Sequence, residues 1–192
     1  MRLSRGIDAV NERIGRAVYW LVLAMVLVSA GNAIIRKTLN MSSNAWLELQ
    51  WYLFSAVFLL CAAYTLLRNE HVRIDIVAGR LSPRGQAWID IFGTLFFLLP
   101  MSILIAVLSW PYFVRGFTQN EISGSAGGLI LWPARLLVPV GFVLLALQGL
   151  SELVKRIAFL AGRGPDPIVR DDRKAEEELA EEIRRLAEEK LQ

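Results

Sequence analysis

Cysteine and histidine are nearly absent from this chain of 192 residues, which contains one of each. The single cysteine, Cys61, cannot form a disulfide within the chain or a metal site that needs several cysteines. The single histidine, His71, is too few for bis-histidine haem ligation and for the two zinc ligands of an HExxH motif. These absences exclude most metalloenzyme and redox classes, and we expect no metal and no other cofactor.

A large excess of one charge sign is also missing. The chain has 21 Lys and Arg against 18 Asp and Glu, which gives a formal net charge of +3. A surface that binds nucleic acid would gather basic residues into a stripe interleaved with aromatic ones. The basic residues of this chain form no such stripe, so we expect no nucleic-acid partner.

Charged residues are missing from three long stretches, and a fourth contains only Arg135. Hydrophobic residues make up 55% of the chain. A helix needs about 20 apolar residues to cross the hydrocarbon core, and a backbone in lipid must satisfy its own hydrogen bonds. The sequence therefore predicts an all-α integral membrane protein with four spanning helices. The predicted spans are about residues 17–35, 46–67, 87–110 and 129–151.

Lysine and arginine alternate in abundance between successive connecting segments. The N-terminal arm and the second connection contain four each, and the C-terminal flank begins with three. The first connection contains two and the third contains one. Because basic residues accumulate on the cytoplasmic side of membrane proteins, this distribution predicts that both termini are cytoplasmic.

The chain divides by composition into two regions. Residues 1–163 form the predicted four-span membrane domain, and residues 164–192 form a charged cytoplasmic tail. Apolar residues recur in the tail at spacings of 4, 4 and 3, which predicts a helix with a narrow apolar stripe, too short for a convincing coiled coil. These residues are Ala175, Leu179, Ile183 and Leu186.

Tryptophan and proline positions agree with this topology. A tryptophan ring prefers the headgroup level of a bilayer, and all six tryptophans fall near a predicted span end. They are Trp20, Trp46, Trp51, Trp88, Trp110 and Trp132. Pro100 and Pro139 lie within the third and fourth spans, where each removes a backbone donor, so we expect kinks at both.

Two charged residues lie at the edge of the predicted spans. Glu48 stands at the start of the second span, and Arg135 lies about one turn inside the fourth. Burying an arginine in a membrane costs about 2.5–3.5 kcal/mol on insertion scales, so we expect Arg135 to have a partner. Glu48 is the nearest candidate by depth. The pair could form an ion or substrate site, or a structural ion pair, and Arg135 could instead extend alone to the interface.

Two connecting segments allow more than one interpretation. Val72–Leu81 is short and amphipathic, which predicts a segment lying at the cytoplasmic interface. His71 and Asp75 are four residues apart, but without a nucleophile they do not make a hydrolase. Glu121–Gly128 is rich in glycine and serine, so we expect a mobile extracytoplasmic linker, with a docking surface as the alternative.

Several of these residues together resemble a known family. A Trp-x-Glu segment (Trp46 and Glu48) opens the second span, and His71-Val72-Arg73-Ile74-Asp75 follows that span. This pattern is similar to the small membrane subunit of tripartite ATP-independent periplasmic (TRAP) transporters, the DctQ-like family, over about residues 10–160. Later segments resemble the mannitol/chloroaromatic-type branch. They are Gly127-Gly128-Leu129, Trp132-Pro133-Ala134-Arg135 and Leu147-Gln148-Gly149.

The resemblance implies a non-catalytic subunit of a sodium-coupled, binding-protein-dependent transporter for an organic acid. The implied partners are the large membrane subunit, a periplasmic substrate-binding protein and the lipid bilayer of the bacterial inner membrane. The small subunit would act as a scaffold and as part of the docking surface. The residues that we expect at subunit interfaces or in structural contacts are Glu48, Arg135, His71, Asp75, Trp46 and Trp132.

Two other classes can be compared with this expectation. A small membrane enzyme would need catalytic groups that meet, whereas Glu48 and Arg135 lie at one depth and His71 at the other. A membrane adaptor or channel-type protein would need faces of small residues for oligomerisation, and Ala30 and Ile34 on the first span do not make one. The adaptor or channel class remains the alternative.

Overall fold

The computed structural model describes residues 2–40, 43–69, 82–163, 180 and 183–184. Helix α1 (Arg2–Thr38) is followed by α2 (Asn44–Leu67), and α6 (Trp132–Leu160) comes last among the described helices. Between them α4 (Pro83–Gly93), the π-helix η1 (Thr94–Leu98) and α5 (Leu99–Thr118) form one continuous helical rod. The expected amphipathic segment Val72–Leu81, with His71 and Asp75, and nearly all of the tail lie outside the described residues.

Four helices of the described chain are long and apolar enough to cross a membrane. They are Ser4–Thr38, Asn44–Leu67, Pro83–Thr118 and Trp132–Leu160. The helical class and the four apolar helices predicted from the charge-free stretches are confirmed. The helices extend beyond the predicted spans at one or both ends, most of all at the start of α1, which begins 15 residues before residue 17. Helix α6 begins at Trp132, three residues after the predicted start of its span, and extends past the predicted end.

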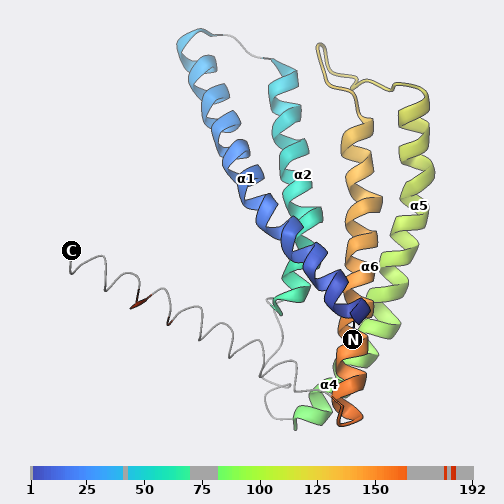
Figure 1. Cartoon of the computed structure of the whole chain (residues 1–192). Helices are drawn as coiled ribbons and strands as arrows, with labels where there is room; N and C mark the ends of the chain where they lie inside the picture. Colours follow the sequence, from blue (N-terminus) through green and yellow to red (C-terminus); the bar gives the residue numbers. More distant parts are fainter. Residues whose placement is uncertain (1, 41–42, 70–81, 164–179, 181–182, 185–192) are drawn as a thin grey trace.

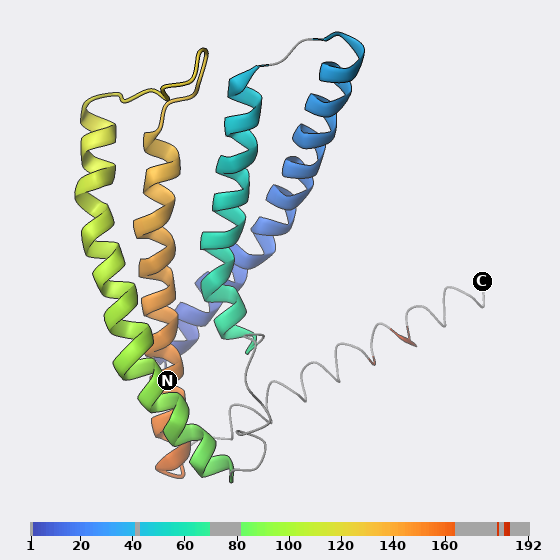
Figure 2. The ribbon, with the colours of Figure 1, turned by 180° about the vertical axis from the view of Figure 1, so that it is seen from behind.

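Helix α6 is the centre of the bundle and packs against every other helix of the described chain. Figures 1 and 2 show α1 beside α2 and α5 beside α6. Helix α1 crosses α2 and reaches α6 at the end where the N-terminus lies, whereas at the end that carries the 119–131 loop it lies away from α5 and α6. The N-terminal end of α1 therefore meets the C-terminal half of α6.

Two glycines in α6 allow neighbouring helices to pack closely against it. A Cβ added at Gly141 would lie 2.9 Å from the backbone oxygen of Leu59, and one added at Gly149 would lie 2.5 Å from Leu98 Cδ2. These distances are shorter than carbon atoms tolerate without displacement. The absence of a side chain at these positions lets α2 and η1 approach the surface of α6.

The π-helix lies directly before Pro100. An α-helix would require the backbone N–H of residue 100 to bond the carbonyl of residue 96, which proline cannot do, and the ring would crowd that carbonyl. In η1 the N–H of Leu99 instead bonds the carbonyl of Thr94, five residues earlier. A π-helical turn is a known way to adapt the helix at such a point. Pro139 lies inside α6 and is followed by continuous α-helix.

Candidate functional site

Polar side chains gather at the end of the bundle that carries the 119–131 loop. They come from α2, from the end of α5, from the loop itself and from the first turn of α6. We call this group the loop-end cluster. Its members are Asn44, Glu48, Tyr52, Tyr112, Glu121, Ser123 and Arg135.

The end of α5 turns the chain sharply and places Glu121. The N–H of Glu121 bonds the carbonyl of Gly116 at 3.1 Å, and the N–H of Asn120 bonds the carbonyl of Phe117 at 3.3 Å. Asn120 has φ 45°, in the left-handed region that asparagine tolerates better than most residues. These two bonds form a Schellman motif, which turns Glu121 back toward the start of α6.

Glu121 is the partner of Arg135. Two guanidinium nitrogens of Arg135 donate to the two carboxylate oxygens of Glu121 at 2.5 and 2.8 Å. The guanidinium also lies 3.9 Å from the ring centroid of Tyr112, a cation–π contact. The Arg135 side chain is 10% exposed. Gly116 leaves it room, because a Cβ there would lie 2.7 Å from Nη1.

Glu121 is held in its charged form by this contact. The hydrogen bond from Arg135 lowers the pKa of the Glu121 carboxyl, and the charges of Arg135 and Arg115 act in the same direction. Desolvation opposes these effects. Glu121 therefore remains ionised at neutral pH, and the pair with Arg135 joins the end of the loop to α6.

The expected pair between Glu48 and Arg135 is wrong. Glu48 is buried near the start of α2, where it accepts hydrogen bonds from the Ser123 hydroxyl and from the backbone N–H of Leu129, the latter at 2.7 Å. Arg135 has Glu121 instead. Arg135 has the partner that its burial requires, but this partner is Glu121, which the Schellman motif brings close and which lies in the segment expected to be a mobile linker.

Helix α2 contacts the loop through residues spaced four apart. One turn before Glu48, Asn44 Nδ2 donates to the carbonyl of Ala126 at 3.0 Å. One turn after it, the Tyr52 hydroxyl donates to the carbonyl of Ile130, also at 3.0 Å. Since residues four apart share a helix face, Asn44, Glu48 and Tyr52 form one polar stripe facing the loop.

The 119–131 loop is ordered by these contacts and by its own backbone. An isolated antiparallel bridge joins Ile122 and Ile130. It is flanked by hydrogen bonds from Ser123 N to Leu129 O and from Leu131 N to Glu121 O, both 2.9 Å. The expectation of a plain mobile linker over Glu121–Gly128 is therefore corrected. Its composition indicated flexibility, but hydrogen bonds to Glu48 and the bridge hold the segment in one conformation.

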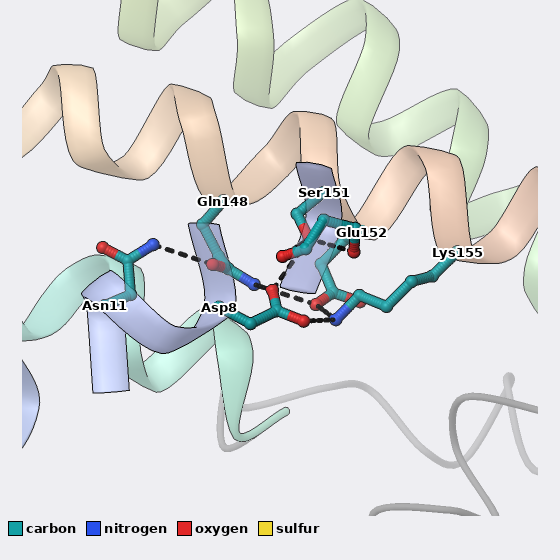
Figure 3. Close-up of polar contacts among 7 residues, drawn as sticks. Asp8, Asn11, Gln148, Ser151, Glu152 and Lys155 are labelled. Carbon is teal, nitrogen blue, oxygen red and sulfur yellow. Dashed lines mark hydrogen bonds and ion pairs between the residues drawn. The ribbon is translucent and has the colours of Figure 1, made fainter. Parts of the chain in front are cut away.

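A second polar group joins the N-terminal end of α1 to α6 (Figure 3). We call it the N-terminal cluster. It consists of Ser4, Asp8, Asn11, Gln148, Ser151, Glu152 and Lys155. Sequence reasoning missed it. The signal was the spacing of polar residues, at 4, 8 and 11 on one helix and at 148, 151, 152 and 155 on another, which places each set on one helix face.

Gln148 is the centre of the N-terminal cluster and is fully buried. Its side-chain oxygen accepts from Asn11 Nδ2 at 2.7 Å. Its side-chain nitrogen donates to Asp8 Oδ1 at 3.0 Å and to Glu152 Oε1 at 3.1 Å. One amide thus contacts two residues of α1 and one of α6.

Lys155 and Ser151 complete the contacts of the two carboxylates. Lys155 Nζ lies 3.3 Å from Asp8 Oδ2 and also pairs with Glu152. The Ser151 hydroxyl donates to Asp8 Oδ1 at 2.7 Å, and Ser4 Oγ lies 2.7 Å from Ser151 Oγ. The cluster therefore links α1 to α6 through charges and hydrogen bonds at an end of the bundle where both helices are polar.

Two further ion pairs join helices at the same end. Arg156 of α6 pairs with Asp90 of α4. Arg68, at the end of α2, bonds Glu12 of α1 at 3.1 Å. Within the described residues, no group of three or more His, Cys, Asp or Glu could hold a metal ion.

The two tryptophans expected at interfaces have different surroundings. The Trp132 ring packs edge-on against Phe117, with centroids 5.5 Å apart, and so joins the first turn of α6 to the end of α5. Trp46, near the start of α2, has an exposed side chain. Trp132 therefore has a structural contact within the chain, whereas Trp46 is available to lipid or to a partner.

One comparison with known proteins finds a match, and it agrees with the sequence pattern. No curated protein and no solved structure matches the chain. A family model described as "Tripartite ATP-independent periplasmic transporters, DctQ component" matches residues 25–159, well over half of the chain. The matched region includes α2, α4, η1, α5, nearly all of α6 and the whole loop-end cluster. The chain belongs to the DctQ component family of TRAP transporters.

Proposed function

We propose that this chain is the non-catalytic scaffold subunit of a sodium-coupled, binding-protein-dependent transporter for an organic acid. It supports the large permease subunit in the inner membrane and forms part of the docking surface for the periplasmic binding protein. The family supports the role of a small TRAP subunit. The segments around Gly127, Trp132 and Gln148 favour a mannitol/chloroaromatic-type system.

The observation that carries this proposal is that the polar side chains of both clusters form their contacts within the chain. In the N-terminal cluster, charged and amide groups bond one another between α1 and α6. In the loop-end cluster, Glu48 of α2 and Arg135 of α6 bond the 119–131 loop, so both clusters hold the bundle together. Large apolar side chains such as Trp20 on α1 and Phe97 on η1 point outward and are more than 60% exposed. A chain with hydrogen bonds and ion pairs inside the bundle and apolar outer faces is suited to pack against lipid and another membrane protein.

The remaining interface candidates belong to this proposal. We expect His71 and Asp75, at the cytoplasmic end of the second span, and Trp46, at its other end, to contact lipid or the large subunit. Glu48 and Arg135 serve the interface through the loop-end cluster, and Trp132 serves it through its ring contact with Phe117. The adaptor or channel alternative would need neither the large subunit nor the binding protein.

Purification and uptake test the role directly. We expect a tagged large subunit to copurify with this chain. Proteoliposomes that contain only this chain should show no sodium-driven uptake of organic acids, because transport requires the large subunit. Uptake should begin when the large subunit and the binding protein are added. Uptake by this chain alone, or failure to bind the large subunit, would end the scaffold proposal.

Cysteine labelling tests the proposed orientation, in which both termini are cytoplasmic. In a chain with Cys61 replaced by alanine, single cysteines are placed at four exposed positions, Ser43, Ser82, Ser125 and Arg163. An impermeant thiol reagent on intact spheroplasts should label positions 43 and 125 only, since the segments richer in Lys and Arg remain inside. After lysis all four should react. Labelling at 82 or 163 before lysis would reverse the orientation.

A further inference from the structure

The 119–131 loop displays two apolar side chains outside the apolar helices. Ile122 is 61% exposed and Ile130 is 44% exposed. The hydrogen bonds that flank their bridge make them a non-hydrogen-bonded pair, whose side chains lie side by side on one face. An apolar pair held together on an ordered loop can form a specific contact with another protein.

Helix α2 fixes this pair through the loop backbone. Glu48 accepts from the N–H of Leu129, and Tyr52 donates to the carbonyl of Ile130 itself. Asn44 holds the tip of the loop through the carbonyl of Ala126. Each of these bonds goes to the main chain, so the stripe determines the conformation of the loop.

We propose that Asn44, Glu48 and Tyr52 are positioning residues for docking, which hold Ile122 and Ile130 in the conformation that the periplasmic binding protein meets. The inference rests on the docking role proposed above and assigns it to this loop. A loop that is already ordered loses less conformational freedom on binding, so less of the interaction energy is spent on ordering it. Releasing the loop should weaken docking while the chain stays folded.

The test uses the reconstituted complex of this chain, the large subunit and the binding protein. Uptake is measured against binding-protein concentration at saturating solute. Tyr52→Phe removes one hydroxyl, and Asn44→Ala removes the tether at the tip. Each should raise the half-saturating concentration of binding protein about fivefold, the effect of losing about one hydrogen bond, with the rate at saturation retained.

The control is Trp51→Phe. Trp51 is adjacent to Tyr52, but its side chain is 70% exposed and makes none of the three bonds from the stripe to the loop backbone. This variant should keep the half-saturating concentration of the parent protein. If Tyr52→Phe and Asn44→Ala behave like Trp51→Phe, or if they lower the rate at saturation without changing half-saturation, the positioning role is overturned.

A cross-link separates positioning from direct contact. In a Cys61→Ala chain that also carries Tyr52→Phe, residues 44 and 126 are both replaced by cysteine, because Asn44 Nδ2 and Ala126 O are 3.0 Å apart. Closing the pair with an oxidant or a short dithiol-linking reagent should return half-saturation to the parent value, and reduction should reverse this. No recovery in a fully linked chain, or a pair that no reagent closes, overturns the proposal.

Substitution of the displayed pair distinguishes failure of this inference from failure of the docking role. Ile122→Ser and Ile130→Ser should each raise the half-saturating concentration of binding protein. If they do so and the α2 variants do not, only the positioning role fails. If neither set changes half-saturation, the loop is no docking surface and that part of the proposed function fails as well.

Discussion

Replacing Gln148 by leucine is expected to destabilise the protein by about 3 kcal/mol, the cost of leaving one to three buried polar groups unsatisfied at about 1–3 kcal/mol each. Gln148 is fully buried and bonds Asn11, Asp8 and Glu152. The two carboxylates keep Lys155, but the amide nitrogen of Asn11 loses the acceptor that Gln148 provides. For a chain of this size the loss corresponds to a fall in Tm of about 6–12 °C.

Thermal unfolding of the purified protein in detergent measures this effect. Gln119→Leu is the matched control, since it is the same substitution at an exposed position that uses only its backbone N–H in the end of α5. It should change Tm little. Adding Asn11→Leu to Gln148→Leu should restore part of the loss, because no stranded amide remains. Equal effects of Gln119→Leu and Gln148→Leu would mean that the N-terminal cluster does not stabilise the fold.

The four apolar helices could be predicted because lipid imposes a simple requirement on sequence. A run of about 20 residues without charge matches the thickness of the hydrocarbon core, and its helical conformation follows from backbone hydrogen bonding. The extent of α1 could not be predicted in this way. Its first turns are polar, and they remain helical in the bundle where Ser4 and Asn11 are buried against α6. Hydropathy cannot detect a polar face that is satisfied by another helix.

The two clusters show why the contacts between polar side chains are harder to predict than the positions of the apolar helices. Because burying Arg135 is costly, the sequence predicts a partner for it, and the structure confirms that it has one. Glu48 was expected as this partner only because it lies at a similar depth in the membrane. The true partner depends on the turn at Asn120, which needs the exact end of α5. In the N-terminal cluster each polar stripe is visible within its own helix. Which two helices face one another is a property of the packed bundle, and a single sequence does not contain it.

Breaking the ion pair between Arg135 and Glu121 should have the second largest effect, a loss in the yield of folded protein. Arg135→Gln leaves Glu121 without its main partner, and Glu121→Gln leaves a mostly buried guanidinium without its counter-charge. Each single variant should lower the yield severalfold, and the double variant should recover part of it, since no stranded charge remains. Yield is measured as monodisperse protein after detergent extraction.

Glu48→Gln provides the comparison for these single and double variants. Glu48 bonds Ser123 and the backbone of Leu129, so combining its substitution with Arg135→Gln should give losses closer to additive. Recovery in the Glu48 and Arg135 double variant, with none in the Glu121 and Arg135 double variant, would show that the pairing described above is wrong.

The same pair predicts how stability depends on pH. The hydrogen bond from Arg135 lowers the pKa of Glu121 in the folded protein. A group whose folded pKa is depressed stabilises the fold above its unfolded pKa, and this contribution is lost as the pH falls toward the folded value. The difference in Tm between the parent protein and Glu121→Gln should therefore be constant from neutral pH down to the ordinary carboxyl range, and it should shrink below that range. A difference that grows on acidification would require Glu121 to be neutral in the folded protein, which is incompatible with its bidentate contact to Arg135.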